Sequence, residues 1–193
     1  LLLMAVIPFG PDLIILGRRV SQGLAAEVNV GALYILAIAS IAVYGIVIAG
    51  WASNSKYALL GGIRSSAQMV SYELALGLAF IGPILLADSL NMAEIVRAQA
   101  GLWFVFLQPI GFFIFLIASI AELNRAPFDM PEAEQELTAG YHTEYSGMKF
   151  ALFFMAEYGK MIAVSFIAAT LFLGGYWGPF VDQVPILGPI YLF

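Results

Sequence analysis

The stretch that decides the fold runs from Ala32 to Ile48 and reads ALYILAIASIAVYGIVI. It lies in a longer interval, between Glu27 and Lys56, that contains no Asp, Glu, Lys or Arg. A helix that spans a bilayer needs about 20 mostly apolar residues, and this interval is long enough for one. A barrel strand would instead be about ten residues of alternating polarity. The stretch therefore predicts a transmembrane α-helix.

Other charge-poor intervals predict more spans of the same kind. No charged residue lies between Arg97 and Glu122, or between Lys160 and Asp182. We therefore expect an all-α, polytopic transmembrane helix bundle, a single membrane domain over 1–193 with about four complete spans. These are expected near 30–51, 68–87, 102–121 and 150–174. Because the chain starts at Leu1 and not at Met, we expect it to be the middle of a longer protein, with partial helices at both ends.

Composition excludes several classes of protein. Hydrophobic residues make up 62% and charged residues 11%, with a mean hydropathy of +0.92. Globular domains carry roughly 45–50% apolar and about 25% charged residues, so a soluble fold and a disordered chain are both excluded. Cysteine is absent and there is one histidine, which excludes an iron–sulfur cluster, a disulfide and a bis-histidine haem. The net charge of −5 argues against nucleic acid as a partner.

Glycine and proline suggest where the helices are interrupted. The pair Gly61-Gly62 lies just before the span expected at 68–87, and we expect it to act as a hinge in the connection 52–67. Pro83 and Pro109 lie within or near expected spans, where proline kinks a helix.

The connection 122–149 is unusually acidic. It holds six of the thirteen acidic residues: Glu122, Asp129, Glu132, Glu134, Glu136 and Glu144. Asp129 with Pro131 and Glu132 is typical of a helix start, on which Glu132 and Glu136 would share a face. Composition alone favours a solvated acidic loop, but closely spaced carboxylates also repel one another and can hold protons. Lysine and arginine counts, four against three, lean toward a cytoplasmic location.

Three acids lie where solvation is harder. Glu73 and Glu157 fall inside expected spans, and Glu122 ends one. Acids inside spanning helices usually face a bundle interior or water and often mark proton paths, although such groups near helix ends can also reach the interface. The i,i+3 spacing predicts that Lys160 pairs with Glu157 and that Arg125 pairs with Glu122.

Two long motifs resemble a known family. The first comprises 50–57, GWASNSKY, and 61–73, GGIRSSAQMVSYE. The second is 121–137, AELNRAPFDMPEAEQEL, which continues to Tyr158. Both are similar to NuoH, a family of membrane subunits of respiratory complex I (NADH-quinone oxidoreductase; the mitochondrial ND-one equivalent). The resemblance covers essentially the whole chain, with no departure inside the motifs.

The resemblance implies a function and a set of site residues. Members sit where the hydrophilic arm meets the membrane arm and line a chamber for ubiquinone or menaquinone. The implied chamber residues are Arg64, Arg125, Asp129, Glu132, Glu134 and Glu136. The implied proton-coupling acids are Glu73, Glu122 and Glu157. No catalytic residue, metal or bound cofactor is expected in this chain.

The resemblance also implies the surroundings of the chain. The implied partners are the quinone-facing hydrophilic pair, small membrane subunits, antiporter-like subunits, the quinone and the lipid bilayer. FMN and iron–sulfur clusters would lie in partner subunits of this oxidoreductase and translocase. A bacterial cell membrane is the expected location, or the mitochondrial inner membrane for a eukaryotic source.

Three alternatives stay open at this stage. A homologous subunit of a membrane-bound hydrogenase-type complex would pump ions without a quinone. A standalone cation or proton transporter would act without partner chains. A structural anchor would tolerate neutral substitution of Glu73 and Glu157.

Overall fold

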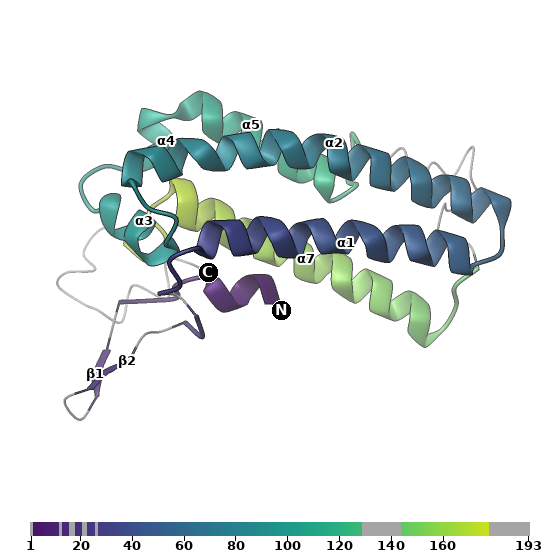
Figure 1. Cartoon of the computed structure of the whole chain (residues 1–193), viewed down its shortest axis with the longest axis horizontal. Helices are drawn as coiled ribbons and strands as arrows, with labels where there is room; N and C mark the ends of the chain where they lie inside the picture. The colour runs from purple at the N-terminus through teal and green to yellow at the C-terminus, as the bar shows by residue number, and fades with distance from the viewer. Residues whose placement is uncertain are drawn as a thin grey trace.

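The computed structural model describes residues 2–11, 13–15, 18–20, 23–25, 27–128 and 144–177. Within them the chain is helical, as expected, apart from one short antiparallel hairpin of β1 (Leu13–Ile15) and β2 (Arg18–Val20) that projects from one end (Figure 1). A 3₁₀ helix, η1 (Leu2–Val6), precedes the hairpin. The remaining elements are α1 (Gly31–Ala52), α2 (Lys56–Ala87), α3 (Met92–Ala98), α4 (Phe104–Leu107), α5 (Pro109–Glu122) and α7 (Met148–Phe172).

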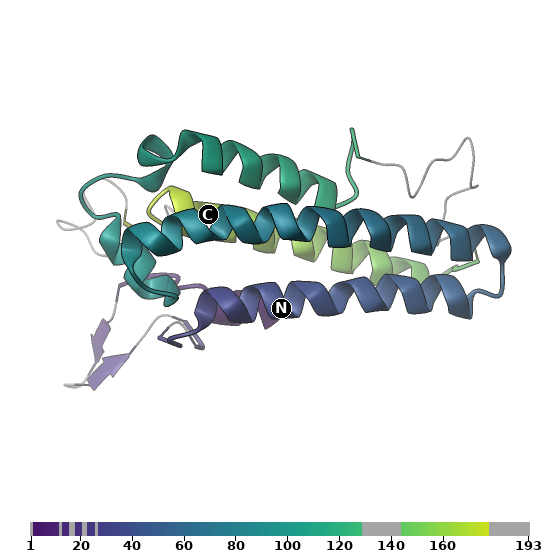
Figure 2. The ribbon, with the colours of Figure 1, turned by 45° about the horizontal axis from the view of Figure 1, so that its top comes forward.

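Three helices in the described residues are long and apolar enough to cross a membrane: α1, α2 and α7. They lie lengthwise beside one another, and α5 packs along α2 (Figures 1 and 2). The bounds of α1 and α7 lie within two residues of the spans expected at 30–51 and 150–174. The chain is therefore a multi-pass membrane bundle.

Helix α2 begins twelve residues before the expected span at 68–87, at Lys56. The pair Gly61-Gly62 is not a hinge, since both residues lie inside the helix and are buried. A Cβ atom on Gly62 would lie 3.3 Å from the Ile46 carbonyl oxygen and 3.4 Å from the Gly50 Cα of α1. Small residues let two membrane helices approach closely. The glycine pair, which the sequence pattern suggested was a hinge, instead allows α1 and α2 to pack closely.

The span expected at 102–121 is two helices, α4 and α5, and not one. Gln108, between them, has φ −132° and ψ 61°, outside the helical region. Proline disfavours a helical conformation in the residue before it, and Pro109 begins α5 as the first helical residue. The proline expected to kink a helix therefore separates two helices, and α5 is only 14 residues long.

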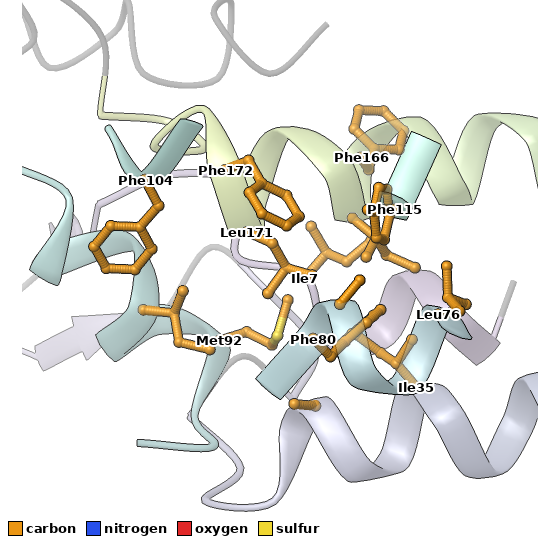
Figure 3. Packing of buried hydrophobic residues seen from close by; sticks show 14 of the residues in the cluster. Ile7, Ile35, Leu76, Phe80, Met92, Phe104, Phe115, Phe166, Leu171 and Phe172 are labelled. Carbon is orange, nitrogen blue, oxygen red and sulfur yellow. The ribbon is translucent and has the colours of Figure 1, made fainter. Parts of the chain in front are cut away.

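The core is an apolar cluster between the helices. Phe80 of α2, Phe115 of α5 and Phe172 of α7 are each at most 1% exposed, and Figure 3 shows them with Ile7 and Leu171 between the ribbons. The rings of Phe115 and Phe172 have centroids 5.4 Å apart. Since lipid tails are as apolar as these side chains, such close packing is what holds membrane helices together.

A buried amide ties one end of the bundle together. Gln99, 1% exposed, follows α3. Its Nε2 donates to the carbonyl oxygens of Ile95 at 3.2 Å and Thr170 at 2.9 Å. Its Oε1 accepts from the backbone N–H groups of Phe104 at 3.3 Å and Gly174 at 3.0 Å. One neutral side chain thus joins α3, the start of α4 and the end of α7.

Candidate functional site

The most buried acid of the described residues sits where α5 meets α7. Glu122, the last residue of α5, is 4% exposed. Its Oε1 lies 2.9 Å from Nζ of Lys160, in the middle of α7. The same ammonium group also donates to the backbone carbonyl oxygen of Glu122 at 3.3 Å. The prediction that Arg125 pairs with Glu122 is therefore wrong.

A second ion pair lies beside the first. Nε of Arg125 is 2.9 Å from Oε1 of Glu157, and the guanidinium carbon lies 5.4 Å from the centre of the Tyr158 ring. The Arg125 side chain is 43% exposed and that of Glu157 is 21% exposed. The expected pairing of Glu157 with Lys160 is therefore also wrong. Each pair links α7 to the end of α5 or the turn after it.

The path of the backbone explains why the partners differ from the i,i+3 expectation. Helix α5 ends at Glu122, and Leu123 is its C-cap. Asn124 then adopts φ +50°, the left-handed conformation that often follows a helix. Arg125 consequently lies beyond the helix, where the i,i+3 geometry no longer applies. The Arg125 side chain therefore does not lie one turn from Glu122 on α5. It reaches Glu157 on α7 instead.

Neutral polar side chains of α2 hold this turn in place. Nε2 of Gln68, which carries two hydrogens, lies 2.8 Å from the carbonyl oxygens of Ala121 and Phe128 and 3.1 Å from Oδ1 of Asn124, so its two N–H groups are shared among three acceptors. Nδ2 of Asn124 donates to Oγ of Ser65 at 2.9 Å. Gln68 thus fixes the first residues of the acidic connection against α2.

The third acid, Glu73, lies between α1 and α2. The hydroxyl of Ser40 on α1 hydrogen-bonds with Oε1 of Glu73, and it also lies 3.0 Å from the Leu36 carbonyl oxygen. A hydroxyl carries one hydrogen and also accepts. Ser40 can therefore donate to an ionised Glu73, or accept from a protonated one while donating to Leu36.

The structure brings some of the predicted residues together and leaves others apart. Arg64 is exposed on α2, nine residues before Glu73. No group of three His, Asp or Glu side chains that could hold a metal occurs among the described residues. The following residues of the acidic connection lie outside the described residues: Asp129, Glu132, Glu134, Glu136 and His142.

Sequence reasoning missed the polar residues that support the acids. Gln68, Ser40 and Asn124 carry no charge, and the search for spans followed charge alone. A usable signal was present, because a neutral polar residue within an apolar membrane helix tends to hydrogen-bond across helices. Applied to 30–51 and 68–87, that rule selects Ser40 and Gln68, which do bond across helices, and also Ser71, which bonds within its own helix.

Charged side chains of opposite sign face one another where α5 meets α7. Two carboxylates and two cations lie in two ion pairs between α5 and α7, so the local charge is balanced. The paired charges of Glu122 and Lys160 are largely removed from solvent, where electrostatic interactions are stronger than in water.

Comparisons with known proteins point to one family. A family model described as NADH dehydrogenase matches residues 1–193. The chain is 57% identical to the second H subunit of NADH-quinone oxidoreductase from Geobacter metallireducens, over 91% of this chain and 54% of the relative. It is 53% identical to the H subunit from Protochlamydia amoebophila, over 97% and 57% of the two chains. It is 56% identical to NADH-quinone oxidoreductase subunit 8 of Rhodothermus marinus, over 91% and 50%. The chain spans about half the length of these curated relatives.

Proposed function

The chain belongs to the NADH dehydrogenase family, with the NuoH proteins of bacterial NADH-quinone oxidoreductases, and from this premise we propose that it lines a quinone chamber and couples quinone reduction to proton translocation. The observation that carries the proposal is the buried Glu122–Lys160 ion pair, which lies at the first residue of the acidic connection. The other acids and the shape of the bundle add support.

The shape of the bundle supports a chamber at one end. Hydrogen bonds from Gln68 place the end of α5 beside the thirteenth residue of α2, and in Figure 2 α5 ends part way along α2. Residues 56–67 of α2, about 18 Å of helix, therefore extend beyond α5. The first part of α7, before Lys160, extends in the same direction (Figure 1). The described first and last residues of the acidic connection, 122–128 and 144–149, lie toward this end of the bundle.

Both described ends of the acidic connection are anchored there. At its start, the Phe128 ring packs against Tyr72 of α2, with centroids 5.3 Å apart. At its end, the Tyr145 hydroxyl donates to the Ala49 carbonyl oxygen of α1 at 2.8 Å. The connection thus starts beside α2 and returns beside α1.

The proposed coupling is electrostatic. Quinone reduction takes up two electrons and two protons. The electrons come from a neighbouring chain, because this sequence has no cysteine to hold an iron–sulfur cluster. Charge that appears on the quinone changes the field at the connection and at the Arg125–Glu157 pair. That change biases the protonation of Glu122, and of Glu73 through the two hydrogen-bonding states of Ser40.

The partners and cofactors follow from the same proposal. The partners are the hydrophilic subunits that face the quinone, the small membrane subunits and the antiporter-like subunits. The quinone is the substrate, and FMN and iron–sulfur clusters lie in the partners. The acidic connection faces the cytoplasm, on the side where the hydrophilic subunits dock.

Substitution of Glu122 tests the coupling. We expect Glu122→Gln in the full-length subunit, within the intact complex, to lower proton pumping per NADH oxidised several-fold, because the amide cannot exchange a proton with Lys160. Pumping is measured in inverted membrane vesicles. Glu94→Gln is the matched control, since Glu94 is an exposed acid at the other end of the bundle and contacts Ser89. Normal pumping by the Glu122→Gln complex would reject the coupling role.

Photolabelling tests the chamber. An azido-quinone added to the intact complex should label peptides from 122–149 or from 64–73, and excess quinone should compete for the label. The absence of competed label anywhere on this chain would contradict the chamber and favour a relative that uses no quinone.

A further inference from the structure

Lys160 on α7 lies between two acids. Its Nζ is 2.9 Å from Oε1 of Glu122 on α5, and it also donates to the Glu122 backbone carbonyl oxygen at 3.3 Å. Glu157 lies three residues before Lys160 on the same helix. Residues at this spacing are neighbours on a helix surface, and the four-carbon stem of lysine is flexible. Lys160 therefore has one carboxylate in contact and a second within reach.

The other helices that face the Glu122–Lys160 pair present apolar side chains to it. A small cavity adjoins the pair, and the residues of α1 and α2 that line it are Ile35, Leu36, Ala39, Leu76 and Phe80. None of these side chains can accept a hydrogen bond from an ammonium group. Among these described neighbours, Glu157 is the carboxylate that remains for an ammonium group that leaves Glu122.

The two acids differ in burial, and the whole cluster is balanced in charge. The side chain of Glu122 is 4% exposed and that of Glu157 is 21% exposed. With Arg125 and Lys160 they form a group of two anions and two cations. If Glu122 took up a proton, Lys160 would become a buried cation without an anion in contact, which is strongly unfavourable.

Glu157 can bind a second cation. Nε of Arg125 lies 2.9 Å from Oε1 of Glu157. A carboxylate has two oxygens and about four acceptor positions, so the contact with Arg125 leaves room for an ammonium group.

We propose that Lys160 is a movable cation, which pairs with Glu122 when that acid is ionised and with Glu157 when Glu122 is protonated. The move places the ammonium group beside a carboxylate that is still ionised, so no buried cation is left without an anion. The pair that the i,i+3 spacing predicts and the pair that the structure shows are then two states of one side chain.

This movement makes Lys160 a positioning residue in the proposed coupling, and that role rests on the proposed function. When Lys160 changes partner, a second cation reaches the carboxylate that holds Arg125. Arg125 lies in the first residues of the acidic connection, three positions before Phe128. The protonation state of a buried acid is thereby transmitted to the start of the connection. By linkage, a change at the connection acts back on Glu122 to the same extent.

The experiment compares cryo-EM maps of the wild-type complex and of the Glu122→Gln complex. Glutamine imitates the protonated acid, because it is neutral and keeps an acceptor oxygen. In the wild-type map we expect Lys160 Nζ beside Glu122. In the variant we expect it within about 4 Å of a carboxylate oxygen of Glu157. An ammonium group that stays against the side chain at position 122 in the variant would overturn the proposal.

A second measurement uses the thermal denaturation midpoint of the solubilised complex. A double-mutant cycle of Glu157→Gln and Lys160→Gln gives the coupling between these two side chains. We expect the non-additive part of the midpoint shift to be larger in the Glu122→Gln background than in the wild-type background. Equal coupling in both backgrounds would contradict the movement. Glu94 and Arg97 are the matched control, because they have the same order and spacing on α3 and are exposed. Their coupling should not depend on the background.

Neither measurement depends on pumping, so the two proposals can fail separately. A Lys160 that does not move would leave the Glu122→Gln pumping test intact. Normal pumping by that variant, together with a Lys160 that moves to Glu157, would reject the coupling role and keep the movable cation.

Discussion

Two regions of the bundle satisfy buried polar groups by different means. Where α3, α4 and α7 meet, the neutral amide of Gln99 bonds four backbone groups. Where α5 ends against α7, the buried groups are charged side chains, Glu122 and Lys160, that bond each other. Backbone groups do not change charge, so the first region is a fixed joint. The second region instead joins two ionisable side chains.

The largest effect on stability is expected at the neutral Gln99. Gln99→Leu would remove the partner of the Thr170 carbonyl oxygen and of the N–H groups of Phe104 and Gly174. Each buried backbone group left without a partner costs about 1–3 kcal/mol. We expect the thermal denaturation midpoint of the solubilised complex to fall clearly. Ser71→Ala, at an exposed and back-bonded serine, is the control and should change the midpoint little. A Gln99→Leu complex as stable as wild type would contradict the claim that Gln99 stabilises the junction of α3, α4 and α7.

The next effect is expected at the buried ion pair. Lys160→Met would leave Glu122 buried without its cation, which for such pairs costs about 3–5 kcal/mol unless the acid takes up a proton. The double variant Glu122→Gln/Lys160→Met should be more stable than Lys160→Met alone, because no unpaired charge remains. Thermal denaturation of the single and double variants forms a double-mutant cycle. Additive effects would show that the two side chains do not act as a pair.

The smallest effect is expected at the outer ion pair. Arg125 is 43% exposed, so solvent screens its attraction to Glu157, and Arg125→Gln should cost about 1 kcal/mol or less. The cost should shrink further at high salt, because salt screens exposed charges. Denaturation midpoints at low and high ionic strength check both points. An effect as large as that of Lys160→Met, and independent of salt, would mean that the two pairs are equally buried.

The sequence allowed the helices to be located better than their breaks. The predictions at Gly61-Gly62 and at Pro109 were wrong because each local signal was interpreted without the residues that surround it in the structure. Gly61-Gly62 resembles a hinge in a linear sequence, but next to Gly50 of α1 it permits close packing. Pro109 resembles a kink, but Gln108 before it leaves the helical conformation, and α5 starts afresh.

In the candidate site, the sequence likewise located the acids but not their partners. The positions of Glu73, Glu122 and Glu157 followed from the cost of placing an acid in an apolar span. Their partners did not follow, because a partner is chosen by which helix lies opposite and not by spacing along one helix. Lys160 lies three residues from Glu157 and yet pairs with Glu122. The supporting contacts of Gln68 and Ser40 likewise join residues far apart in the chain.

The sequence by itself determined that this chain is a helical membrane protein with acids in its spans, because hydropathy and charge act locally along a helix. It also carried motifs long enough to identify the family. Only the tertiary structure decided which charges pair and where α5 ends relative to α2. Those features depend on contacts between helices, and a local pattern contains no information about which face of which helix lies opposite.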